Sequence, residues 1–308
     1  MLVFKNKYNL KSNHYYIAGL TDTRIYLGSY KYRKNLTSLD SGLKVESQLP
    51  IRYPNMRIAW QALFLKVDSP NIYATERISP LVLNFNIQGD FVGKQVIAGK
   101  FDRVIPVSHN RSLMRSLDGN LNQRVLRSSS SHQNEISADT FKLTKQLDGS
   151  FCVDGMMAYY PDKDTFLYTY YYRNEFYRLD SNLNLIYAAK TIDTNSRAKI
   201  TVATLKTSQK REDKMFSSPP LMVNKGAAIS ADKIYIQCAL KADNEHQDNF
   251  NASDVIDVYS LANGNYAYSF YIPRLNDKPL TSFQVRHNTL VVLAGDFIYT
   301  YQIKHPSI

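Results

Sequence analysis

The residues of this sequence best suited to chemistry are charged and amide side chains that stand beside turns. A carboxylate can act as a general acid or base, a guanidinium can hold an anion through its planar fork, and an imidazole can exchange a proton near neutral pH. The residue types therefore predict a site for a polar ligand, and the pattern assigns no catalytic role. The candidate site residues are Lys145, Asp148, Asp154, Arg173, Asn174, Asp193, Asp243, Asn244, Glu245 and His246.

Each candidate also has an ordinary structural interpretation. Asp148 and Asp154 each precede a glycine, and an aspartate in that position usually accepts hydrogen bonds from the backbone of a turn. An arginine in a hairpin, such as Arg173, is usually solvated or paired with a nearby carboxylate. His246 stands beside Glu245 without any further partner motif. Both interpretations stay open at this point.

Oxygen ligands are frequent in the polar stretch 243–254, "DNEHQDNFNASD", which makes calcium the one metal to consider. Its carboxylates are Asp243, Glu245, Asp248 and Asp254. The stretch lacks the central glycine and the closing glutamate of the regular calcium loop. We therefore expect no metal or cofactor, with calcium as the alternative.

Several motifs that identify enzyme classes are absent from the chain. There is no H-E-x-x-H, no G-x-S-x-G, no G-x-x-x-x-G-K-[ST] and no G-x-G-x-x-G. Cys152 and Cys238 are the only cysteines, too few for a disulfide framework and wrongly spaced for a zinc or redox pair. We expect two buried thiols, with a mutual disulfide as the alternative.

The elements that must position these residues are predicted to be β-strands. The chain has 23 Tyr and 14 Phe but only 12 Gly, and aromatic residues favour strands. "TFLYTYYY" and "EFYRLD" alternate with a period of two on either side of Arg173-Asn174. "LNLIYAAKTI" follows them and "SFCVDGMMAYYP" precedes them. Residues 150–192 thus predict a four-stranded antiparallel sheet.

The same pattern recurs along the chain with a period of roughly 40 to 50 residues, which indicates a β-propeller of four-stranded antiparallel blades. It is clear in 226–273 and 282–303 and degenerate in 15–30, 62–87 and 103–126. We predict a single all-β domain over 1–308 with six blades, seven being the alternative. The last unit lacks an outer strand, which residues 1–10 would supply by pairing with the C-terminal strand. The tyrosines then mostly pack between blades.

Propeller topology would place the candidate residues on one face. The loops that lead from one blade to the next lie on the same face as the turns between the two middle strands of each blade. All ten candidates fall in such loops or turns.

Three segments resemble the TolB-like class of six-bladed propellers, whose exported members are functionally uncharacterised: "QLDGSFCVDGMMAYY", "YTYYYRNEFYRLDSNLNLIYAAKTIDT" and "VIDVYSLANGNYAYSFYIP". The resemblance covers about residues 140–303. It implies an extracytoplasmic protein, periplasmic or lipid-anchored at the surface. Because residues 1–19 lack a secretory signal, we expect that signal to lie outside the present sequence. The class includes binding scaffolds as well as hydrolases, lactonases and lyases.

The formal charge of +11 favours anionic partners, but the Lys and Arg residues are scattered and form no basic block. RNA-recognition and zinc-finger signatures are absent, which argues against nucleic acid. No apolar stretch approaches the roughly 18 to 20 residues of a transmembrane helix. We predict a non-catalytic scaffold that binds a protein, peptide or glycan. The alternative is a propeller enzyme, a lactonase, glycan hydrolase or lyase, with its site at the central channel mouth.

Overall fold

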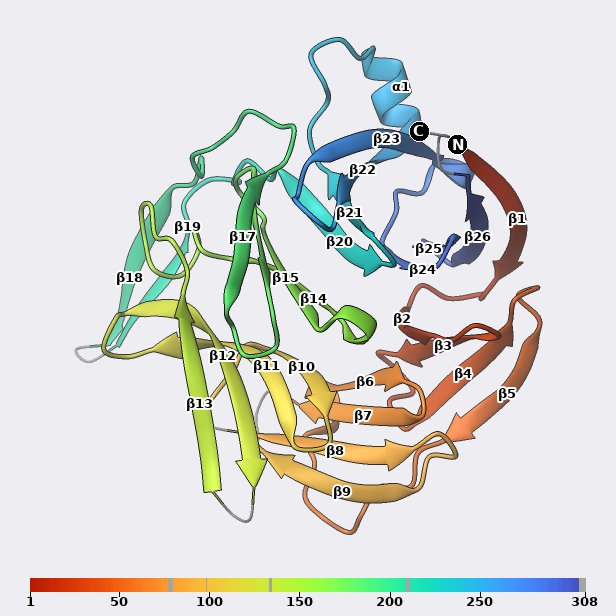
Figure 1. The fold of residues 1–308 in the computed structure, drawn as a ribbon, viewed down its shortest axis with the longest axis vertical. Helices are drawn as coiled ribbons and strands as arrows, with labels where there is room; N and C mark the ends of the chain where they lie inside the picture. The colour runs from red at the N-terminus through yellow and green to blue at the C-terminus, as the bar shows by residue number, and fades with distance from the viewer. Residues whose placement is uncertain (77–79, 98, 133–134, 209–210, 305–308) are drawn as a thin grey trace.

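Six four-stranded antiparallel sheets form a ring in the computed structural model (Figure 1), which describes residues 1–76, 80–97, 99–132, 135–208 and 211–304. The fold is thus the predicted all-β propeller, with six blades and not seven. The innermost strands are β2, β6, β10, β14, β20 and β24, and they surround a central channel.

The strands follow one another in chain order from the centre of each blade to its rim. Blade 1 consists of β2 (Tyr15–Leu20), β3 (Arg24–Ser29), β4 (Asn35–Asp40) and β5 (Val45–Pro50). Blade 2 consists of β6 (Leu63–Asp68), β7 (Asn71–Glu76), β8 (Leu81–Asn86) and β9 (Phe91–Val96). Blade 3 consists of β10 (Arg103–Ser108), β11 (Arg111–Asp118), β12 (Gln123–His132) and β13 (Glu135–Lys142).

The second half of the ring follows the same order. Blade 4 consists of β14 (Gly155–Tyr160), β15 (Thr165–Tyr170), β16 (Glu175–Leu179) and β17 (Leu185–Lys190). Blade 5 consists of β20 (Asn224–Ser230), β21 (Lys233–Cys238), β22 (Ser253–Ser260) and β23 (Tyr266–Pro273). Blade 6 consists of β24 (Ser282–Arg286), β25 (Thr289–Ala294), β26 (Phe297–Ile303) and, at its rim, β1 (Leu2–Asn9).

Pairing of the two terminal strands closes the ring, as the sequence predicts. β1 runs antiparallel to β26, with Leu2 opposite Ile303 and Asn9 opposite Phe297, and the register shifts once near Phe4. The amino group of Met1 adds a 2.8 Å hydrogen bond to the carbonyl of Lys304. Blade 6 is therefore built from both ends of the chain (Figure 1).

The tyrosine-rich stretch of blade 4 fills the spaces on both sides of that blade. Tyr168 and Tyr170 of β15 belong to a buried cluster with Leu113 and Leu126 of blade 3. Leu167, on the opposite side of the same strand, packs in a cluster with residues of blade 5. The period of two therefore reflects packing against two neighbouring blades.

The chain segment that connects blade 4 to blade 5 forms a two-stranded hairpin, which the sequence did not predict. β18 (Val202–Ser208) pairs with β19 (Arg211–Phe216) outside the ring (Figure 1). The Phe216 ring lies 4.4 Å from the ring of Phe151 and 5.7 Å from that of Tyr172, centroid to centroid. These contacts anchor the hairpin to blade 4.

Helices are few and short in the described part of the chain. They are η1 (Trp60–Ala62), η2 (Pro161–Lys163), α1 (Gln247–Ala252) and η3 (Leu275–Asp277). α1 lies within the polar insertion of blade 5. None of these helices is long and apolar enough to cross a membrane.

Candidate binding site at the upper channel mouth

The first residues of the innermost strands gather around a cavity at one end of the channel, which we call the upper mouth. The cavity has a volume of about 420 Å³. Its lining includes Arg103, Ile105, Met156, Tyr171, Lys225 and Phe283. The last residues of the same strands line the opposite end of the channel. All innermost strands therefore run in the same direction through the ring.

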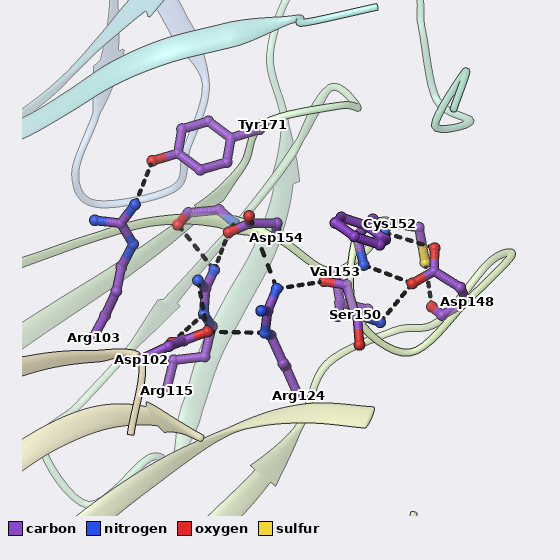
Figure 2. Close-up of polar contacts among 12 residues, drawn as sticks. Asp102, Arg103, Arg115, Arg124, Asp148, Ser150, Cys152, Val153, Asp154 and Tyr171 are labelled. Atoms are coloured by element: carbon purple, nitrogen blue, oxygen red, sulfur yellow. Dashed lines mark hydrogen bonds and ion pairs between the residues drawn. The ribbon is translucent and has the colours of Figure 1, made fainter. Parts of the chain in front are cut away.

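A network of two arginines and two aspartates borders the upper mouth between blades 3 and 4 (Figure 2). Arg115 donates from Nε and Nη2 to the two carboxylate oxygens of Asp102, at 2.9 and 3.0 Å. Its Nη1 donates to Asp154 and, at 3.2 Å, to the carbonyl of Gly155. Arg124 pairs with Asp102 at 2.8 Å. Both carboxylates thus face guanidinium groups.

The neighbours of Arg115 stabilise its positive charge. The side chain of Arg115 is only 3% exposed, and burial alone would lower its pKa. The Tyr168 hydroxyl and the carboxylates of Asp102 and Asp154 outweigh burial, so the pKa of Arg115 lies above its ordinary value. Paired carboxylates of this kind hold the two blades together and are poorly placed to act as a general acid or base.

Two further cations at the mouth have no carboxylate partner within 4.0 Å among the described residues. Arg103 donates from Nη2 to the hydroxyl of Tyr171 at 3.4 Å (Figure 2), and Lys225 lines the same cavity at the start of β20. Both side chains are exposed. With the network, the mouth holds four cations and two carboxylates, a formal charge of +2, so it favours an anionic ligand.

Asp154 is the one predicted residue that belongs to the network at the mouth. Asp148, six residues earlier, instead caps a turn: its carboxylate accepts hydrogen bonds from the amides of Ser150 and Phe151, each at 2.6 Å (Figure 2), and from that of Cys152 at 3.1 Å. Lys145 is exposed in the loop that leads into blade 4.

The predicted residues of the β15–β16 turn are buried. Arg173 is fully buried, and its guanidinium donates to Glu175 at 2.7 Å and to the carbonyl of Thr144 at 2.9 Å. Asn174 donates to the carbonyl of Asp193, which joins the turn to the chain that leaves β17. The Asp193 carboxylate in turn accepts the amide of Asn195 at 2.6 Å.

The insertion of blade 5 forms a separate groove away from the upper mouth. Asn244, Glu245 and His246 line a cavity of about 390 Å³ together with Tyr271. Asp243 is exposed beside them. The predicted residues therefore divide between several places on the ring, and of the ten only Asp154 joins the network that borders the upper mouth.

The described residues contain no cluster of side chains that could bind calcium as the alternative requires. Asp254 pairs with Arg274 at 3.2 Å and accepts the amide of Leu280 at 2.9 Å. No three His, Cys, Asp or Glu side chains of the described residues are grouped as a metal site would require.

Both cysteines are free thiols. Cys152 is buried and Cys238 is half-buried. Burial raises the pKa of Cys238 to about 12, with a further contribution from Asp257.

Sequence reasoning missed most of the residues at the upper mouth. Arg103 and Lys225 each stand at the start of an innermost strand, where the chain enters a blade, so propeller topology is the signal that marks them. Arg115 and Arg124 lie on the middle strands of blade 3, and no local pattern marks their partners.

Comparison with solved structures places the fold among β-propellers. The structure is similar to a member of the DUF4221 family from Bacteroides vulgatus, with 12% identity and a TM-score of 0.60 over 99% of this chain and 98% of that one. It is also similar to a candidate exported protein from Bacteroides fragilis, with 11% identity and a TM-score of 0.55 over 99% and 95% of the two chains.

A eukaryotic propeller shares the architecture as well. The WD40 domain of Neurospora crassa Pan2 has 8% identity and a TM-score of 0.50 over 99% of this chain and 96% of that one. At these identities the likeness shows the fold alone. No family model and no curated protein matches the sequence.

Proposed function

We propose that the protein is a non-catalytic binding propeller whose upper mouth receives an acidic, partly apolar peptide segment of a partner protein. The observation that carries this proposal is the pair of exposed cations, Arg103 and Lys225, which lack a carboxylate partner among the described residues. Charged hydrogen bonds to a carboxylate are stronger than neutral ones, and an arginine can form two at once.

The lining of the cavity favours a peptide over a glycan. Phe64, Met156 and Phe283 supply apolar surface between the cations. Peptide pockets combine such surface with a few well-placed polar groups, so an acidic side chain flanked by apolar residues fits this mouth. A sugar chain would leave that apolar surface poorly matched.

The rival proposal, a lactonase, glycan hydrolase or lyase at the same mouth, has less support. It would need a carboxylate ready to exchange a proton or bind a metal. Asp102 and Asp154 are instead engaged by Arg115 and Arg124. We therefore favour binding.

The test uses two pools of end-blocked, fluorescent hexapeptides of apolar residues that differ only at one central position, glutamate or glutamine. Fluorescence polarisation measures their binding at low and moderate salt. We expect the glutamate pool to bind about 10 to 100 times more tightly, the range given by a charged hydrogen bond. Binding should weaken as salt rises.

Matched charge reversals distinguish binding at the upper mouth from non-specific binding to the positive charge of the whole protein. Arg103→Glu with Lys225→Glu should abolish the preference for glutamate. The control, Lys142→Glu with Lys190→Glu, makes the same charge change at exposed positions on the rim strands β13 and β17. Equal losses in both variants, or equal binding of the two pools by the native protein, would overturn the proposal.

We also propose that the protein belongs to the TolB-like class and works outside the cytoplasm, as a periplasmic or lipid-anchored surface protein. The six-bladed ring and the similarity to a candidate exported protein support this. Cell fractionation of the native gene product, with detection by antibody, tests it, and recovery in the cytoplasmic fraction alone would contradict it.

A further inference from the structure

Lys66 extends from the innermost strand of blade 2 into the central channel. Along β6, Leu65 and Val67 are buried against neighbouring blades, whereas the alternate residues Phe64, Lys66 and Asp68 are only partly buried and line the channel. The channel cavity at this level has a volume of about 380 Å³. It shares Phe64 with the upper mouth, so the two spaces adjoin.

The amine of Lys66 makes few polar contacts with the described residues. Its Nζ donates to the carbonyl of Pro106 on β10 at 3.2 Å, and no carboxylate of the described residues lies within 4.0 Å of it. Ile105, Met157 and Phe283 contribute apolar side chains to the cavity wall. The amine therefore faces a space that a small organic molecule could occupy and that offers the amine few competing partners.

Among the described residues, the other ionisable groups that line this cavity come from β2, β6, β14 and β24 and from the turns after β14 and β24, whereas β10 and β20 contribute none. These groups are Tyr16, Asp68, Tyr159, Tyr160, Asp162, Arg286 and His287. The Arg286 guanidinium pairs with Asp22 at 2.7 Å, and Nε2 of His287 lies 3.0 Å from the same carboxylate, at the end of the channel opposite the upper mouth. Burial lowers the pKa of Lys66, and the nearby charge of Asp68 opposes that effect only in part.

We infer that Lys66 is a nucleophilic amine that captures small aldehydes or ketones in the channel as imines. A desolvated lysine in an apolar pocket is the usual setting for this reaction. The lone pair of the neutral amine attacks the carbonyl carbon, and a proton moves from nitrogen to oxygen to give a carbinolamine. The C–O bond then breaks, the hydroxyl leaves as water with the remaining hydrogen of the nitrogen, and the C=N bond forms. No oxidant or reductant takes part, and the inference is independent of peptide binding at the upper mouth.

The test uses the native protein and propanal as the probe. Sodium cyanoborohydride reduces any imine to a stable secondary amine, and peptide mass mapping then gives the rate of modification at each lysine. At pH 7 Lys66 should be modified faster than the exposed Lys142 and Lys190, because its lowered pKa leaves a larger share of the amine neutral and reactive. The rate at Lys66 should also level off below the usual pKa range of a lysine.

Lys66→Arg is the matched variant, since arginine keeps a positive charge and a donor for the Pro106 carbonyl but forms no such imine. The Lys66→Arg variant should show no modification at position 66 and unchanged, slow modification of Lys142 and Lys190. Modification of Lys66 in the native protein at the same rate as the exposed lysines, or more slowly, would overturn the inference, whatever the variant does.

Discussion

The guanidinium carbon of Arg173 lies 3.5 Å from the centre of the Tyr170 ring. The two side chains stack in the interior of blade 4, although Arg173 belongs to the turn that follows β15. The same guanidinium donates to Glu175 and to the carbonyls of Thr144 and Cys152. This arginine thus ties the turn to the loop that leads into its own blade.

Replacing Arg173 should therefore destabilise the fold. Arg173→Met keeps much of the volume but removes the stacking, the pair with Glu175 and the donor to the carbonyls of Thr144 and Cys152, so we expect a loss of about 3 kcal/mol or more in the free energy of unfolding. Urea denaturation measures it. Arg52→Met, which removes an exposed pair with Asp90, is the control and should have a much smaller effect. Equal stability of the two variants would contradict the structural role.

A second prediction concerns the network that joins blades 3 and 4. Arg115→Met leaves the carboxylates of Asp102 and Asp154 with Arg124 alone, and breaking a buried charge pair in this way typically costs about 3 to 5 kcal/mol. Asp154→Asn should cost less, because Arg115 keeps its two bonds to Asp102. A double-mutant cycle between positions 115 and 154 should give a coupling energy of at least about 1 kcal/mol. Additive effects would show that the two residues do not interact.

The sequence predicted blade 4 well because its strands obey local rules. The period of two and the turn at Arg173-Asn174 place β15 and β16 within about two residues of their observed ends. Ring closure was also predictable, because the last blade lacks a rim strand and residues 1–10 have the pattern of a strand that could supply it. The hairpin β18–β19 escaped prediction because nothing in a regular repeat requires it.

The candidate site was harder to predict because its contacts are not local. Arg115 and Asp154 are 39 positions apart and meet only through the packing of two blades. Arg173 illustrates the opposite difficulty: its place in a hairpin suggested a solvated side chain or one paired with a nearby carboxylate. It does pair with Glu175, but the loop around Thr144 and Cys152 also covers it. Residue type identified groups able to bind ligands, but tertiary packing decided which of them face the channel.

A third prediction follows from the closure of the ring by β1. Deleting residues 1–9 exposes the edge of β26 and removes Leu2, which packs against the buried cluster between blades 5 and 6. We expect a fall in Tm of roughly 5 °C or more and a tendency to aggregate, because an unpaired edge strand is a template for other chains. Calorimetry and light scattering measure the two effects. A synthetic peptide of residues 1–10 should restore part of the lost stability, whereas unchanged melting of the deleted protein would contradict closure by β1.

A final prediction concerns pH and the buried carboxyl of Asp257 on β22. Burial raises its pKa, Asp193 adds to the effect, and hydrogen bonds from Ser269 at 2.6 Å and from Tyr259 oppose it. The folded protein then holds this proton more tightly than the unfolded chain, so the stabilisation is complete below the ordinary pKa of about 4 and is lost as pH rises through the folded pKa.

Asp257→Asn removes the charge while keeping an acceptor for Ser269. Urea denaturation should show the variant gaining stability over the native protein between pH 4 and pH 8. Asp232→Asn is the control of opposite sign, because Lys233 lowers the pKa of Asp232, whose small stabilisation exists above the ordinary pKa and disappears as pH falls. A stability difference for Asp257→Asn that stays constant from pH 4 to pH 8 would mean that this carboxyl titrates alike in the folded and unfolded chains.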